Sequence, residues 1–154
     1  MTKCVATMSL VLAVLVSVAT GQEKRVSMKD LPAPVQKTVR EQTKNAKLHG
    51  LSTEVEKGKR EYEAELIVDG HSKDVTMNAA GEIIEVEEQV SMNSLPQAVQ
   101  GGLTKQAGKG RITKVESVTR DGNLAFYEAQ VKTGTKHSEV RANPDGTPAK
   151  GGEE

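Results

Sequence analysis

The sequence predicts an α+β protein built as a tandem repeat, in which each unit is a helix packed on an antiparallel β-meander of three to four strands. One observation is repetition: a Val-Ser-Met tripeptide followed by a Leu-Pro pair occurs at residues 26–36 and again at 90–100, an offset of 64 residues. The other is periodicity, because each unit changes from the period of about 3.6 residues of a helix to the period of about 2 residues of a strand. Repetition at a fixed offset indicates one supersecondary design used twice.

Two further blocks repeat in the same order. Tyr-Glu-Ala at residues 62–64 returns at 127–129, and a valine strand that ends in Asn-x-x-Gly returns from 75–81 at 140–146, both at an offset of 65 residues. Three separated blocks in one register are hard to obtain by chance. The fold is therefore interpreted one unit at a time.

Each unit is expected to open with a helix, over residues 32–46 in the first and 96–107 in the second. A Leu-Pro pair stands at each start, where proline is tolerated because its missing N–H has no intrahelical partner. Asp30 and Ser94 are expected to cap these helices. Apolar residues at helical spacing predict one narrow buried face, and they are Leu31, Val35 and Val39, then Leu95, Val99 and Leu103.

Strands are expected after each helix, because polar and apolar residues alternate there as they do in half-buried antiparallel strands. Asp-Gly pairs at 69–70 and 121–122 predict tight hairpin turns between strands. The second unit offers three strands, and its fourth is expected to be missing or frayed. The expected strands are 51–56, 60–68, 74–78 and 82–89, then 112–119, 125–133 and 138–143.

Residues 1–21 are expected to be a secretory signal peptide, since Lys3 precedes an uncharged run over residues 5–19. An uncleaved N-terminal anchor is the alternative. After cleavage no membrane span is expected, and the location is expected to be periplasmic or secreted.

The mature chain is expected to divide into residues 22–89 and 90–146, with residues 147–154 as a disordered tail. The only cysteine, Cys4, lies in the signal peptide, so disulfides and thiol nucleophiles are excluded from the mature protein. A unit of this length is marginally stable alone. The two units are therefore expected to pack on each other or to share a sheet, around a mainly aliphatic core that Tyr62 and Tyr127 close.

Charge is unevenly distributed along the chain. Residues 26–90 carry 9 basic and 13 acidic side chains, whereas residues 91–154 carry 9 basic and 7 acidic ones. Neither half has a basic stripe that could follow a phosphate backbone, and aromatic residues for base stacking are scarce. No nucleic-acid partner is expected.

A valine, a Leu-Pro pair that opens a helix, a Tyr-Glu-x strand and a valine strand ending in Asn-x-x-Gly recur in this order between residues 26 and 146. This pattern resembles the PepSY-like domain, in the exported tandem form grouped with the β-lactamase-inhibitor-like proteins. The resemblance implies a helix packed on an antiparallel sheet and a bacterial periplasmic or secreted protein. It also implies a binding role, because PepSY domains occur in propeptides of thermolysin-like peptidases and are associated with peptidase restraint.

Glutamates alternate along one expected strand of the first unit, and Glu85 and Glu87 are expected on a neighbouring strand, all facing away from the helix. One interpretation is an acidic face that binds a cationic peptide or a divalent metal ion through oxygen ligands. The other is a solvated face that keeps the sheet soluble. The candidate partner contacts are Glu61, Glu63, Glu65, Phe126, Glu128 and Lys132.

No catalytic, cofactor-binding or metal-binding residues are expected. Ser72 follows His71 and Ser138 follows His137, and strand neighbours point to opposite faces, so neither pair forms a dyad. The chain is expected to be a non-catalytic exported protein that binds a protein or peptide partner, with restraint of a peptidase as the most specific form. The alternative is an envelope sensor of a small ligand or metal ion, which would use the carboxylates and the two hairpin histidines.

Overall fold

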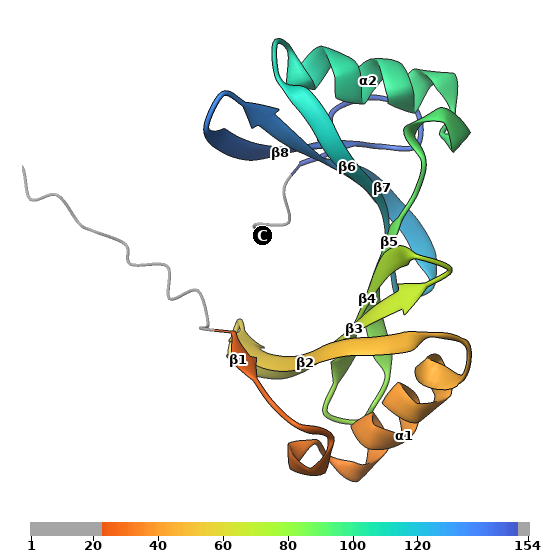
Figure 1. The fold of residues 1–154 in the computed structure, drawn as a ribbon, viewed down its shortest axis with the longest axis vertical. Coiled ribbons are helices and arrows are strands. Elements are labelled where there is room, and N and C mark those ends of the chain that lie inside the picture. The colour runs from red at the N-terminus through yellow and green to blue at the C-terminus, as the bar shows by residue number, and fades with distance from the viewer. Residues whose placement is uncertain (1–22, 151–154) are drawn as a thin grey trace, which may run out of the picture.

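A computed structural model describes residues 23–150, so the expected signal peptide lies outside the described residues. The described chain forms one eight-stranded sheet whose strands are neighbours in chain order (Figure 1), and all seven strand pairs are antiparallel. The α+β class is thereby confirmed. The strands are β1 (Lys24–Arg25), β2 (Lys47–Glu56), β3 (Lys59–Val68), β4 (His71–Asn78), β5 (Ile83–Gln89), β6 (Arg111–Arg120), β7 (Asn123–Thr133) and β8 (Lys136–Ala142). The helices are α1 (Ala33–Gln42) and α2 (Gln97–Ala107), with short 3-10 helices η1 (Met28–Asp30), η2 (Thr43–Asn45) and η3 (Met92–Ser94).

Both α-helices begin directly after a proline, Pro32 for α1 and Pro96 for α2, one residue later than the sequence predicts. α1 ends earlier than expected because its last turn tightens into η2. Asp30 does not cap α1. Its Oδ2 instead accepts a hydrogen bond from the Ser27 N–H at 3.1 Å and so stabilises η1.

Each helix packs its apolar stripe on the sheet and forms a core there. Tyr62 is buried within the first core, and Tyr127 packs against the second, so both tyrosines close the cores as expected. The buried residues of the first core are Leu31, Val35, Val39, Leu51, Tyr62, Ala64, Leu66, Val75 and Met77. Those of the second core are Leu95, Val99, Leu103, Val115, Ala129 and Ala142.

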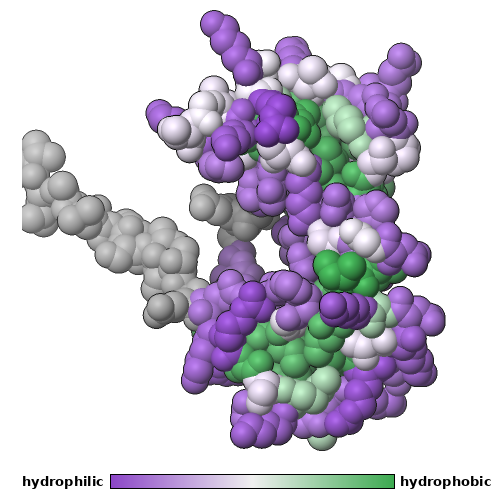
Figure 2. Space-filling model, in the orientation of Figure 1, coloured by the Kyte–Doolittle hydropathy of each residue, from purple (hydrophilic) through white to green (hydrophobic). Residues whose placement is uncertain are grey.

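The two halves are joined by the pairing of β5 with β6, along residues 85–89 and 116–120. They therefore share a sheet, which is one of the two arrangements that the sequence predicts. The sheet curves, and both helices lie on its convex side (Figure 1). Tyr62 and Ala64 of β3 belong to the core on the helix side, and Glu63 between them points to the opposite side of the sheet. We call this opposite side the concave face. Figure 2 shows hydrophobic atoms within each half and hydrophilic residues around the hollow between the halves.

The repeated Asn-x-x-Gly segments form turns that pack against the first turn of each helix. A Cβ atom at Gly81 would collide with the Pro34 carbonyl oxygen, and one at Gly146 would collide with the Ala98 carbonyl oxygen. The two glycines also have positive φ angles of +77° and +84°, which side chains disfavour. The repeated glycine thus reflects the same close approach of turn and helix in both halves.

Two segments differ from what the sequence predicts. The short strand β1 was not expected, and it pairs with β2. Residues 147–150 were expected to be part of a disordered tail, but they return along the edge of β8: Pro148 bridges Ala142, and the Ala149 N–H donates to the Arg141 carbonyl at 3.0 Å. The turn at Gly146 explains this difference, because it reverses the chain and directs residues 147–150 along the outer edge of β8. Within residues 23–150, no helix has the length and apolar character that crossing a bilayer requires.

Candidate functional site

Acidic side chains form a row across the concave face, from β3 to β7. Strand pairing places Glu65 opposite Asp74, and Asp74 opposite Glu87. Beyond the β5–β6 pairing, Glu116 stands opposite Glu128. We call these five residues the carboxylate row. The row crosses the junction between the two halves, so both halves contribute to it.

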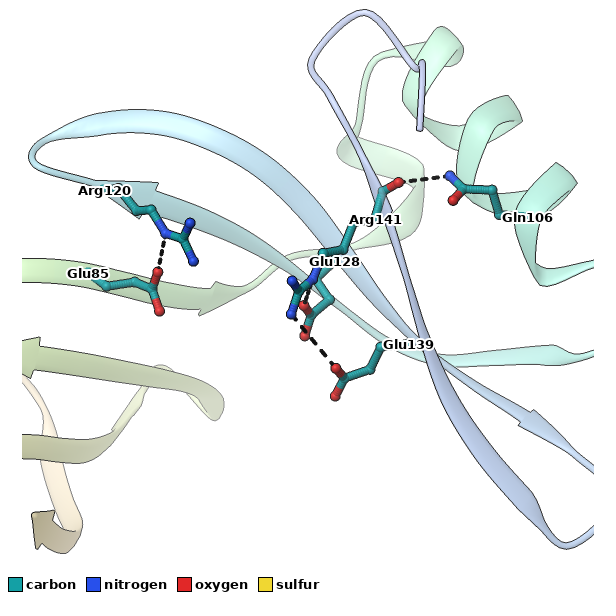
Figure 3. Close-up of polar contacts among 6 residues, drawn as sticks. All are labelled: Glu85, Gln106, Arg120, Glu128, Glu139 and Arg141. Atoms are coloured by element: carbon teal, nitrogen blue, oxygen red, sulfur yellow. Dashed lines mark hydrogen bonds and ion pairs between the residues drawn. The ribbon is translucent and has the colours of Figure 1, made fainter. Parts of the chain in front are cut away.

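Arginines pair with both ends of the carboxylate row. At one end, Arg25 of β1 forms an ion pair with Glu65. At the other end, Arg141 Nε donates to Glu128 Oε2 at 2.5 Å, and the Glu128 side chain is only 9% exposed (Figure 3). Charge is therefore balanced at the ends of the row by hydrogen-bonded or paired guanidinium groups.

The centre of the row lacks such balance. One carboxylate oxygen from each of Asp74, Glu87 and Glu116 lies within 4.8 Å of the others. Glu116 is buried, and its Oε1 makes no hydrogen bond among the described residues. The Lys114 ammonium lies 2.6 Å from this oxygen as a charge contact that lacks hydrogen-bond geometry. Lys114 thus forms an ion pair with one of the three carboxylates, while His49 and Arg120 act on Asp74 and Glu87 from farther away.

Phe126 lies on the concave face but is not an exposed aromatic contact. It is 6% exposed, because Arg120 and Arg141 cover its ring with their guanidinium carbons 5.2 Å and 5.1 Å from the ring centroid. Arg120 Nε also donates to Glu85 Oε2 at 2.5 Å (Figure 3). Each arginine is therefore held by a carboxylate while it contacts the ring.

A groove of about 470 Å³ lies beside the row, on the half of the concave face nearer α1. Eight carboxylates and two cationic side chains, Lys57 and Arg120, line it. A strongly negative potential is expected there, since the facing side chains carry one sign of charge. The carboxylates are Glu54, Glu56, Glu61, Glu63, Asp74, Glu85, Glu87 and Asp121.

Burial and mutual repulsion hold protons on this face. Burial raises the pKa of Glu63 to about 7, and the neighbouring charge of Asp74 adds to the shift. Burial likewise raises the pKa of Glu87 to about 7, with repulsion from Glu85 and Glu116. The pKa of Asp74 is raised by burial, and Lys114 opposes that shift. The face therefore gains negative charge as the pH rises through neutrality.

We expect the free energy of unfolding to fall as the pH rises from about 4.5 to about 7. In that interval the folded chain keeps protons on Glu63 and Glu87, whose pKa values are about 7 rather than 4.5, while the unfolded chain loses them. Glu87→Gln should flatten this decline and stabilise the protein at pH 8. Solvent screening of a partly exposed carboxylate limits the gain to on the order of 1 kcal/mol. Urea unfolding at pH 5, 6, 7 and 8 measures it, and stability that rises with pH would contradict the assignment.

The structure brings some of the expected contact residues together and separates others. Glu61 and Glu63 line the groove, whereas Glu65 and Glu128 are engaged by arginines. Lys132 is exposed and pairs with His137 across β7 and β8. The residues that the sequence did not single out are Asp74, Glu116, Arg120 and Arg141.

The hairpin histidines do not form a common site. His71 begins the pairing of β4 with β3, and His137 lies in β8, with β5, β6 and β7 between the two strands. The one compact group of potential metal ligands among the described residues consists of three carboxylates and includes neither histidine. This arrangement therefore does not support a sensor site shared by the two histidines.

A family model with the provisional description beta-lactamase-inhibitor-like, PepSY-like matches residues 18–84 and again 60–146. The chain belongs to this PepSY-like family. The two overlapping matches cover most of the sequence, in agreement with the resemblance that the repeated motifs indicated. No curated protein matches the chain.

Solved structures from Bacteroides share the fold. A protein of B. eggerthii, whose description places it provisionally in the periplasm, has a TM-score of 0.64 at 17% identity, over 78% of this chain and 86% of its own. A DUF2874 family protein of B. ovatus has a TM-score of 0.60 at 20% identity, over 78% and 85%. A BLIP-like protein of B. fragilis has a TM-score of 0.57 at 21% identity, over 77% and 84%. The described location agrees with the periplasmic or secreted location that the sequence predicts.

Proposed function

We propose that this PepSY-like protein is non-catalytic and binds a protein or peptide partner through the concave face, in the periplasm or outside the cell. The observation that carries the proposal is the charge of the groove, because eight carboxylates and two cationic side chains line it. Charge complementarity steers association and fixes the register of partners. The complementary partner carries a segment rich in lysine or arginine.

The proposed contact residues differ in how a partner reaches them. Glu61 and Glu63 line the groove and are available directly. Glu65 and Glu128 would exchange their arginines for partner groups, and Phe126 becomes a contact where Arg120 and Arg141 move aside. Lys132 lies beyond the row, on the exposed end of β7.

We further infer that the two halves are copies of one helix-plus-meander unit. Leu31 and Leu95 both enter a core beside a helix start. Gly81 and Gly146 both allow a turn to approach that helix. A duplicated unit with a shared sheet provides a concave face longer than one unit could offer, which suits an extended partner segment.

Restraint of a peptidase is the specific form of binding that we propose to test first. The family description refers to inhibitors, and the resemblance to PepSY domains connects this fold with peptidase propeptides. A restraining protein needs a binding face and no catalytic groups, which agrees with a groove lined by carboxylates on strands.

Exchange of two groove glutamates for lysine is expected to abolish partner capture. Purified wild type, Glu61→Lys/Glu63→Lys and the control Glu41→Lys/Glu82→Lys would each be used to recover partners from a periplasmic extract. The control alters the same number of charges at exposed positions outside the groove. We expect the wild type and the control to recover the same partner, and the groove variant to lose at least 90% of it. Equal recovery by all three proteins would exclude the acidic groove as the binding face.

A further inference from the structure

The three central carboxylates of the row come from three adjacent strands and from both halves of the chain. Asp74 lies on β4, Glu87 on β5 and Glu116 on β6. The sequence indicated a divalent metal ion only as one interpretation of the acidic face and named no ligands, because carboxylates alternate along each strand. The register across β4, β5 and β6 brings them together, with oxygens within 4.8 Å of one another. Two oxygens that bind one calcium ion at about 2.5 Å can lie at most about 5 Å apart.

Glu116 supplies an independent observation. Its side chain is only 5% exposed, and its Oε1 is buried and accepts no hydrogen bond from any residue of the described range 23–150. A buried carboxylate normally accepts hydrogen bonds, because an unsatisfied one is costly. Glu128, also buried, does so from Arg141. The contact of Glu116 Oε1 is a charge contact with Lys114, whose side chain is 25% exposed at the border of the cluster.

Charge balance indicates what is needed at the centre of the row. Each end carboxylate has its own arginine. At the centre, Lys114 forms an ion pair with Glu116, and Arg120, whose charge also acts on Glu87, is held by Glu85. Two negative charges therefore remain when all three are ionised. One divalent cation among the three carboxylates would neutralise them.

We propose that Asp74, Glu87 and Glu116 together bind a divalent cation of the calcium class at the junction of the two halves. The donors are carboxylate oxygens, which calcium prefers. Zinc-type sites are instead built mainly from nitrogen or sulfur donors. The oxygens lie within 4.8 Å of one another, which is inside the limit of about 5 Å for calcium. Calcium also tolerates irregular coordination, whereas magnesium demands near-ideal octahedral geometry. Water from the adjacent groove, which Asp74 and Glu87 also line, completes the coordination.

Isothermal titration of the mature chain with calcium chloride in calcium-free buffer tests the site. We expect one saturable site with a dissociation constant of about 10⁻⁴ to 10⁻³ M, as in extracellular calcium modules, and weaker binding of magnesium. Glu116→Gln keeps the side-chain shape and should weaken calcium binding at least tenfold. Glu41→Gln removes the same charge from an exposed helix position and should leave it unchanged.

A second variant guards against loss of binding through misfolding. Lys114→Met removes the ammonium that competes for Glu116, so calcium should bind at least tenfold more tightly, while Lys136→Met at an exposed position should have no such effect. No saturable calcium binding by the wild type overturns the proposal, whatever Lys114→Met does. Equal weakening by Glu116→Gln and Glu41→Gln also overturns it, since that result indicates diffuse screening. No partner is present in this titration, so its failure is separate from failure of partner binding.

Discussion

Replacement of Met77 or Leu103 with alanine is expected to lower the free energy of unfolding by about 2–5 kcal/mol. Both side chains are fully buried, Met77 in the first core and Leu103 in the second. The total stability of a domain is only about 5–15 kcal/mol, so either change removes a large share of it. Chemical denaturation followed by circular dichroism measures the loss.

The two core variants also test how the halves are coupled. Because β5 and β6 pair within one sheet, we expect each variant to lower one shared unfolding transition rather than to produce two. Leu124→Ala, at a side chain that is 42% exposed, is the control and should change stability by less than about 0.5 kcal/mol. Separate transitions for the two halves would show that the sheet does not couple them.

Replacement of Arg141 with methionine is expected to cost about 3–5 kcal/mol near neutral pH. The change leaves Glu128 buried with its charge unpaired, because Arg141 Nε is the donor to its Oε2. It also uncovers one side of the Phe126 ring. Thermal or urea unfolding at pH 7 measures the loss, and acidification should relieve part of it by protonating Glu128.

A double-mutant cycle separates the ion pair from packing at this position. Glu128→Gln combined with Arg141→Met should be more stable than Arg141→Met alone, since no unpaired charge is then buried. If the double variant is as unstable as the sum of the single changes, the Glu128–Arg141 contact contributes no coupling. The loss of stability in Arg141→Met would then come from the uncovered Phe126 ring alone.

The fold could be predicted largely from sequence because its local signals agree with one another. Proline marks the start of each helix, and Asp-Gly pairs mark the hairpin turns. The strand β1 was missed because two residues are too few for a period to be visible. Residues 147–150 were missed because the single bridge from Pro148 to Ala142 depends on where the preceding turn directs the chain.

The concave face was predicted only in part. Glu61 and Glu63 could be placed by alternation along one strand, and a two-residue turn at Asp69 and Gly70 would also have placed Asp74 opposite Glu65. Glu116 could not be placed in this way. Its position depends on the pairing of β5 with β6 across an intervening helix, and no local sequence signal sets that register.

Burial of Phe126 was equally hard to predict. An aromatic residue on the open face of a sheet is expected to be exposed, but Arg120 and Arg141 cover it from two strands. Alternation gives the side of the sheet on which a residue lies. It does not give the long side chains that fold over that side, which depend on ion pairs with Glu85 and Glu128.

Site-specific photo-crosslinking tests most directly whether the concave face binds the partner. A photoreactive phenylalanine analogue would be placed in the groove at Thr76, and in a second protein on the exposed helix position Lys37. After irradiation in periplasmic extract, we predict a discrete crosslinked partner from position 76 and none from position 37. A partner crosslinked from position 37 but not from position 76 would contradict the proposed binding face.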